Sequence, residues 1–154
     1  MRKSFVAVFI ISLFFCLNPL FAQNAPDFKL NDISGKEVSF SSLKGNKPVI
    51  LFFWTTWCPY CRAELKELMN LSGDFKKDGV ELLVIDVGEE KYKVESFLKA
   101  RSLNLNVLLD NDSSVSQSYE LLGVPTYVFI TKAGEIALKD NSFSKDAYRL
   151  LITK

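Results

Sequence analysis

Two cysteines three positions apart, Cys58 and Cys61, are the residues of this chain best suited to chemistry. The third cysteine, Cys16, lies in an apolar N-terminal segment, and the chain contains no histidine. A structural zinc site needs four ligands, so this pair alone does not complete one. Two cysteines this close together are also too few to staple a small domain. The pair therefore predicts a redox-active dithiol that needs no metal and no cofactor.

The position of the pair favours a reactive first sulfur. Cys58 follows a continuous run of strand-forming residues at 49–54, and Pro59 is typical of the first turn of a helix. Unpaired N–H groups and the helix dipole stabilise negative charge there, so we expect Cys58 to be an exposed nucleophile with a lowered thiol pKa. Cys61, one turn further, should be more buried and should resolve the mixed disulfide formed at Cys58. The alternative is a static disulfide that braces the helix.

Alternating strand and helix patterns surround this pair. We expect strands at 38–40, 49–54, 81–87, 106–109, 126–130 and 136–138. We expect helices at 59–78, 89–101, 113–121 and 144–151. Helices between buried strands predict an α/β fold, with a mixed central sheet flanked by helices on both faces. No linker rich in proline or glycine divides the chain after residue 22, so we expect one domain over 23–154.

The segment 1–22 is typical of an export signal. Two basic residues near its start precede the run 5–17, which is apolar apart from one serine, and Ala22 offers a small residue for cleavage. The run is shorter than the roughly 20 residues that a helix needs to span a bilayer. We therefore predict a cleaved signal peptide and a periplasmic or other extracytoplasmic protein. Two alternatives are an uncleaved membrane anchor and a lipid attached to Cys16.

The charge balance argues against one class of partner. The chain has 19 basic and 18 acidic residues, and removal of residues 1–22 would take away two basic residues and no acidic one, leaving 17 against 18. A nearly neutral body lacks the basic footprint of a nucleic-acid-binding protein. Hydrophobic residues make up 48% of the chain, which is enough for a packed core.

Taken together, these motifs resemble the thioredoxin superfamily, and within it the ResA/TlpA type of exported thiol–disulfide oxidoreductase. The resemblance rests on four segments after the signal: Ala25-Pro26-Asp27-Phe28, Leu43-Lys44-Gly45, Pro48 to Cys61, and Gly123-Val124-Pro125-Thr126. It implies a thioredoxin fold that exchanges disulfides with protein substrates through Cys58 and Cys61. Residues expected to shape the substrate-contact surface are Trp57, Pro59, Tyr60, Val124 and Pro125.

The resemblance also implies a role for a proline and a carboxylate. The family proline that matches Pro125 is cis and lies beside the dithiol, where it leaves the backbone open to an extended substrate; alternatively, Pro125 merely starts a strand. The buried aspartate of general thioredoxins is replaced here by Phe52. Glu64, three residues after Cys61, matches a glutamate of the ResA-like branch that adjusts thiol pKa values and accepts a proton. Its alternative is a solvent-facing residue near a helix N-terminus.

The direction of exchange follows from the resemblance, not from the residues. A ResA-like protein reduces disulfides of exported proteins, with apocytochrome c as a client during cytochrome c maturation and a membrane electron donor of the CcdA or DsbD type. We expect a monomer.

Three alternative functions are considered. A disulfide-forming oxidase remains an alternative, although no large helical insertion is present. A peroxiredoxin would need proline where Phe53 stands, and the intact dithiol argues against a module that only binds.

Overall fold

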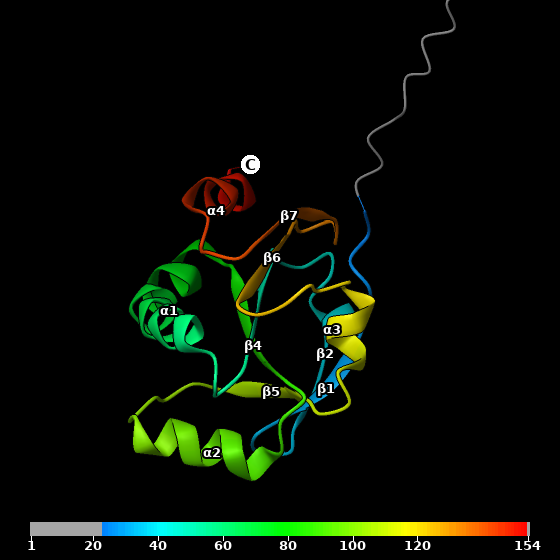
Figure 1. Ribbon diagram of the computed structural model, residues 1–154. Coiled ribbons are helices and arrows are strands. Elements are labelled where there is room, and N and C mark those ends of the chain that lie inside the picture. Colours follow the sequence, from blue (N-terminus) through cyan, green and yellow to red (C-terminus); the bar gives the residue numbers. More distant parts are fainter. Residues whose placement is uncertain (1–22, 154) are drawn as a thin grey trace, which may run out of the picture.

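The computed structural model describes residues 23–153, so the predicted signal at 1–22 and the suggested lipid site at Cys16 lie outside the described residues. The described strands form a single mixed sheet of seven strands in the order β2-β1-β5-β4-β3-β6-β7 (Figure 1). The central strands β3, β4 and β5 run parallel, and the other neighbours pair antiparallel. The strands are β1 (Lys29–Asp32), β2 (Glu37–Ser39), β3 (Val49–Trp54), β4 (Glu81–Val87), β5 (Val107–Asp110), β6 (Thr126–Ile130) and β7 (Ile136–Asp140).

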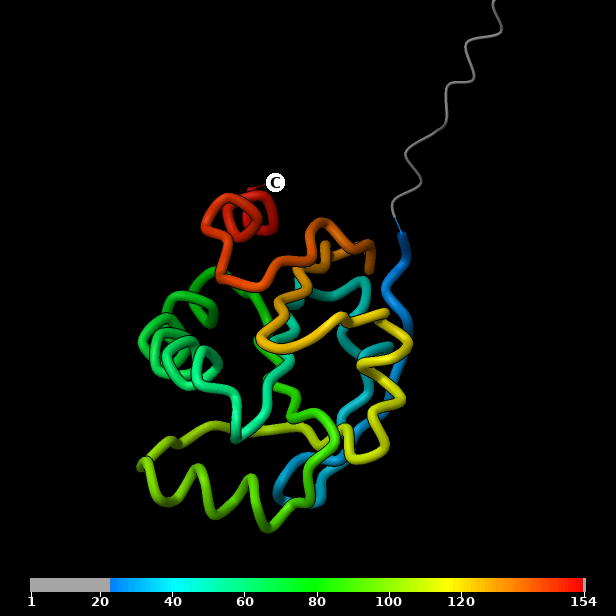
Figure 2. The backbone as a smooth tube through the Cα atoms, viewed as in Figure 1, coloured from blue at the N-terminus to red at the C-terminus, as the bar shows by residue number. Residues whose placement is uncertain are grey.

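Helices cover both faces of this sheet, as predicted. They are α1 (Pro59–Asp78), α2 (Lys91–Ala100), α3 (Ser114–Ser118), α4 (Lys145–Ile152) and the 3-10 turn η1 (Phe40–Ser42). Side chains of α1, α2 and α4 belong to the hydrophobic cluster on one face, and those of α3 and η1 to the cluster on the other. Figure 2 shows α3, in yellow, beside the blue N-terminal strands and across the sheet from the green α1. The fold is the predicted α/β arrangement.

Strand β3 is the centre of the core, and it fixes the position of the cysteines. All six of its residues are buried, because β4 pairs on one side and β6 on the other. Its side chains alternate between the two clusters, so that Phe52 and Trp54 face α1 while Phe53 faces α3. Burial of each such large apolar side chain contributes about 1.5–3 kcal/mol. The chain therefore leaves the sheet at a defined point after Trp54, four residues before Cys58.

Helix α1 occupies the predicted span. Pro59 fills its first turn, and Leu65, Leu68 and Phe75 bury one face against β3 and its neighbours. The helix ends at Gly79, which adopts the left-handed conformation with φ 71°. This packing holds the N-terminus of α1 close to the C-terminal end of β3.

Several predicted boundaries differ from the structure. Strand β1 was not predicted, because it is short and half-exposed and gains its hydrogen bonds by pairing with β2 and β5. The strand predicted at 38–40 is β2, which stops at Ser39 because Phe40 begins η1. The helix predicted from residue 89 begins at Lys91, and the one predicted at 113–121 is only Ser114–Ser118.

The two glycines of the α1 region should respond to alanine in opposite directions. A Cβ at Gly79 meets no atom, but its positive φ strains any L residue, so Gly79→Ala should lower the free energy of unfolding by about 1–2 kcal/mol. Gly73 lies inside the helix with open space around it, so Gly73→Ala should raise it by about 0.5–1 kcal/mol. Urea unfolding of both variants measures this, and changes of the same sign would contradict the proposed helix end.

Candidate active site

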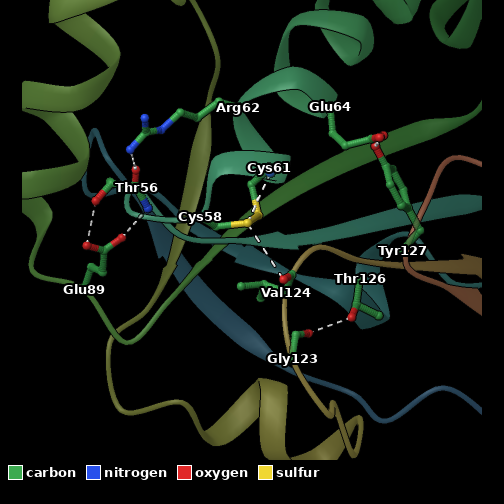
Figure 3. Close-up of a disulfide and its surroundings, with 10 residues drawn as sticks. All are labelled: Thr56, Cys58, Cys61, Arg62, Glu64, Glu89, Gly123, Val124, Thr126 and Tyr127. Carbon is green, nitrogen blue, oxygen red and sulfur yellow. Dashed lines mark hydrogen bonds between the residues drawn. A yellow bond between two sulfur atoms is a disulfide. The ribbon is translucent and has the colours of Figure 1, made fainter.

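Cys58 and Cys61 form a disulfide at the N-terminus of α1, with their Cα atoms 5.3 Å apart (Figure 3). Cys58 is the N-cap residue of the helix, and its Sγ accepts a hydrogen bond of 3.1 Å from the amide of Cys61. The first N–H groups of a helix have no carbonyl partner within the helix, so a sulfur at the N-cap can take that place. A negative charge on Cys58 Sγ would be stabilised by this amide and by the helix dipole.

Both cysteines are buried, so the predicted exposure of Cys58 is wrong for the disulfide. Cys58 is 3% exposed and Cys61 is 0% exposed. The reason is the loop before β6, which lies against the disulfide and places the carbonyl oxygen of Val124 3.8 Å from Cys58 Sγ. A disulfide sulfur has no proton, so this approach is a contact and not a hydrogen bond. Solvent therefore reaches only a narrow edge of Cys58.

The loop before β6 contains the cis peptide bond Val124–Pro125, as the resemblance implied. The hydroxyl of Thr126 donates a hydrogen bond of 2.7 Å to the carbonyl of Gly123 and closes the loop. Thr126 also pairs with Phe53 across β6 and β3. Since β3 and β6 are antiparallel neighbours, the end of one strand and the start of the other lie at the same edge of the sheet. Val124 and Pro125 thus lie beside Cys58.

Large apolar side chains around the disulfide are exposed to solvent. Trp57 and Tyr60 flank Cys58 in sequence and are 66% and 77% exposed, and Pro59 between them is also exposed. Leu122, just before the loop with the cis bond, is fully exposed. Sequence reasoning did not single out Leu122; its position two residues before Val124 was the available signal. Exposed apolar residues next to a reactive pair are suited to contact another protein.

Glu64 does not face the sulfurs in the disulfide state. Its carboxylate accepts a hydrogen bond of 2.6 Å from the hydroxyl of Tyr127, and Figure 3 shows both side chains directed toward each other and away from the disulfide. Burial, followed by the bond to Glu64, raises the pKa of Tyr127 far above its ordinary value. Tyr127 was missed from the sequence because its β-strand pattern predicted only a core residue. Glu64 is half-buried, which excludes the fully solvent-facing alternative.

The turn between β3 and α1 is held from both sides. The Glu89 carboxylate accepts hydrogen bonds from the amide and the hydroxyl of Thr56, at 2.6 and 2.8 Å. The guanidinium of Arg62 donates a bond of 3.3 Å to the carbonyl of Thr56. Neither partner was predicted, because Glu89 lies 33 residues from Thr56 and nothing local indicates the contact. These bonds keep the residues that precede Cys58 in one position.

A second buried carboxyl group lies near this turn. Asp86 pairs with Trp54 in the register of β4 and β3, it is fully buried, and its two oxygens find no donor within residues 23–153. The indole N–H of Trp54 and the hydroxyl of Thr55 are likewise without partners in that range. Burial raises the pKa of Asp86 to about 8, and the negative charge of Glu89 adds to the effect. Asp86 is therefore mostly a neutral acid at pH 7.

Within residues 23–153, no group of three or more potential metal ligands comes together. In the same part of the chain, no helix combines the length and the apolar character needed to cross a membrane.

The raised pKa of Asp86 makes stability depend on pH. Between about pH 4 and pH 8 the folded state binds a proton that the unfolded state has released, so the free energy of unfolding falls as the pH rises. Asp86→Asn should remove this dependence: similar stability at pH 5, and a gain of about 4 kcal/mol over wild type at pH 8.5. Urea unfolding of the oxidised protein at both pH values measures the difference.

Asp112 provides the matched control. Its carboxylate is exposed, and hydrogen bonds from Ser114 lower its pKa, so its contribution is lost only in acid and is constant between pH 5 and pH 8.5. Asp112→Asn should leave the slope of stability against pH as it is in wild type over this interval. An Asp86→Asn variant with the wild-type slope would show that Asp86 is ionised at neutral pH.

Comparison with known proteins gives the same fold and a consistent family. A family model described as the AhpC/TSA family matches residues 21–139. The thiol-disulfide oxidoreductase ResA of Bacillus subtilis is 40% identical over 114 residues, which cover 74% of this chain and 63% of that protein. ResA of Halalkalibacterium halodurans is 30% identical over 145 residues, covering 88% and 82%. The crystal structure of a secreted Mycobacterium tuberculosis disulfide oxidoreductase is 28% identical, with a TM-score of 0.68 over 81% of this chain and 93% of that one.

The matches cover different shares of the relatives. The chain spans just under two thirds of the Bacillus subtilis protein, at 63%, but more than four fifths of the Halalkalibacterium halodurans protein, at 82%. The family model covers most of the chain, including the cysteine pair and the loop with the cis bond. With a mixed sheet, a disulfide at a helix N-terminus and these relatives, the chain belongs to the AhpC/TSA family of thioredoxin-fold proteins and is similar to the ResA thiol–disulfide oxidoreductases.

Proposed function

We propose that this protein is an extracytoplasmic thiol–disulfide oxidoreductase that reduces disulfides of exported proteins with its Cys58–Cys61 pair. The observation that carries the proposal is the hydrogen bond from the Cys61 amide to Cys58 Sγ at the start of α1. This donor is in place before the disulfide is reduced, so it stabilises the Cys58 thiolate without any rearrangement of the backbone. The relatives that match most of the chain bear the name of this activity.

The exchange transfers two electrons to the client disulfide. The Cys58 thiolate attacks one sulfur of the client, a bond forms between these two sulfurs, and the other client sulfur leaves as a thiolate. Cys61 then gives up its proton and attacks Cys58 Sγ. The Cys58–Cys61 disulfide forms, the bond to the client breaks, and the second client sulfur leaves as a thiolate that takes up a proton. The client is reduced and the protein is oxidised.

Residues around the pair have defined tasks in this mechanism. The narrow exposure of Cys58 requires the client to approach beside Val124, whose backbone can pair with an extended segment of the client. Trp57, Pro59 and Tyr60 supply apolar contact area next to the nucleophile. Glu64 accepts the proton of Cys61 when the mixed disulfide resolves. Its position one helical turn after Cys61 and its partial burial support this role.

The cellular setting belongs to the same proposal. Residues 1–22 direct export, and residues 23–154 act as a single domain outside the cytoplasm. The client is apocytochrome c, whose haem-attachment cysteines are kept reduced, and a membrane protein of the CcdA or DsbD type returns electrons to the pair. Support comes from the similarity to ResA proteins and to a secreted disulfide oxidoreductase.

Substitution of each cysteine should give a different result in an insulin-reduction assay with dithiothreitol. Cys58→Ser removes the nucleophile, so turbidity should rise no faster than with dithiothreitol alone. Cys61→Ser keeps the nucleophile but cannot resolve the intermediate, so mass spectrometry should find a mixed disulfide at Cys58. If wild type and Cys58→Ser reduce insulin at the same rate, the proposed activity is wrong and the binding module stands.

The direction of exchange is tested by the redox potential of the pair. Equilibration with glutathione buffers, followed by alkylation of free thiols, should give a value below about −230 mV, where a dithiol acts as a reductant. The disulfide-forming oxidase predicts a value near −120 mV, because such enzymes stabilise their reduced form. Titration of Cys58→Ser under the same conditions is the control, since it has no partner thiol to form the disulfide.

A further inference from the structure

The bond between Tyr127 and Glu64 joins the start of β6 to the first turns of α1. Tyr127 follows Pro125 by two positions, and its partner Glu64 follows Cys61 by three. The ring of Tyr127 is fully buried and lies 4.6 Å from the ring of Phe52 and 5.8 Å from that of Phe143, measured between ring centroids. These contacts hold the ring, so the hydroxyl occupies one place and meets the Glu64 carboxylate at 2.6 Å.

Donation from a phenol to a carboxylate stabilises the ionised form of the carboxylate. The pKa of Tyr127 is raised by burial and by the Glu64 charge, so the phenol keeps its proton at neutral pH and acts only as a donor. Within residues 23–153, Tyr127 is the single hydrogen-bond donor to Glu64, and no basic side chain forms an ion pair with it. The position of the Glu64 carboxylate therefore depends on this one hydroxyl.

Few other titratable groups surround the pair. On α1 these are Cys61 and Glu67, whose charge also acts on Tyr127. On β7, Asp140 lies opposite Tyr127 in the register, and its carboxylate accepts bonds from the amides of Asn141 and Ser142. On β3, the position facing Tyr127 is Phe52, which cannot titrate. Among these groups, the Tyr127 hydroxyl is hydrogen-bonded to Glu64 alone.

We propose that Tyr127 is a positioning residue for thiol–disulfide exchange: its hydroxyl holds the Glu64 carboxylate in a fixed place one turn from Cys61. The inference rests on the proposed function, in which Glu64 accepts the Cys61 proton. In the disulfide state Cys61 carries no proton, and the Glu64 carboxylate accepts a hydrogen bond from the Tyr127 hydroxyl. In the dithiol state the Cys61 thiol and the Tyr127 hydroxyl are alternative donors to the same carboxylate.

The test follows the resolving step alone. The reduced protein is mixed in stopped flow with excess 5,5′-dithiobis(2-nitrobenzoic acid), which releases one thiolate when Cys58 attacks and a second when Cys61 resolves. The second phase is unimolecular, so its rate does not depend on reagent concentration, and it is measured from pH 5 to pH 9. Tyr127→Phe should slow this second phase by about tenfold and leave the first phase unchanged, because the Glu64 carboxylate is no longer held in place.

Tyr119→Phe is the matched control. Tyr119 is also a buried tyrosine, but it belongs to the hydrophobic cluster on the opposite face of the sheet. Its hydroxyl donates a hydrogen bond to the carbonyl of Pro26. Its substitution should lower stability about as much as Tyr127→Phe and leave the rate profile unchanged. Glu64→Asp keeps a carboxylate but shortens it by one methylene, so it should break the bond to Tyr127 and slow the second phase as well.

The double variant decides between positioning and a structural role. In Glu64→Gln the carboxylate is gone and the Cys61 proton must leave to water, so the second phase should be slower than in wild type and Tyr127→Phe should slow it no further. If Tyr127→Phe slows the second phase equally in the Glu64→Gln background, or has no effect in wild type while Glu64→Gln does, the inference is wrong and the proposed function stands. If Glu64→Gln itself leaves the second phase unchanged, the role of Glu64 fails, and the inference fails with it. The Cys58→Ser insulin assay tests the activity independently of both.

Discussion

An amide N–H in the first turn of a helix has no carbonyl to bond within the helix, and in this protein the sulfur of Cys58 takes that place. The contact is local, spanning three residues, but its strength depends on where α1 begins. That point is defined by β3, which is buried on both faces and ends at Trp54, and by Pro59, which starts the helix. The reactive sulfur is therefore placed by the packing of the core beneath it.

Two turns meet over this sulfur, and each is fixed by contacts of its own. The turn before Cys58 is held by Glu89 and Arg62 through Thr56. The turn at Val124 is closed by a side-chain bond at Thr126 and brought into place by the pairing of β6 with β3. Because β3 and β6 are antiparallel neighbours, both turns lie at one edge of the sheet. The same pairing that builds the core thus restricts the access of clients to the disulfide.

Ionisable groups on the α1 face of the sheet show two ways to bury a carboxyl group. Glu64 is half-buried and has a donor in Tyr127, whose own pKa is raised by burial and by the contact. Asp86 is fully buried and has no donor within the described chain, and burial raises its pKa to about 8. The difference follows from the desolvation of charge: an anion needs a donor when it leaves water, and without one the carboxyl group keeps its proton.

The sequence alone determined the features that depend on neighbouring residues. The apolar run of β3, the helical period and left-handed glycine end of α1, and the spacing of Cys58 and Cys61 are all local signals, and they correctly predicted the sheet core, the helix and the dithiol. Only the tertiary structure decided the burial of Cys58, the bond of Glu89 to Thr56 and the bond of Tyr127 to Glu64. These contacts join residues 33 to 66 positions apart, and side-chain type and period carry no information on which distant groups will meet. Strand β1 was missed for the same reason, since its hydrogen bonds come from distant β5 as well as neighbouring β2.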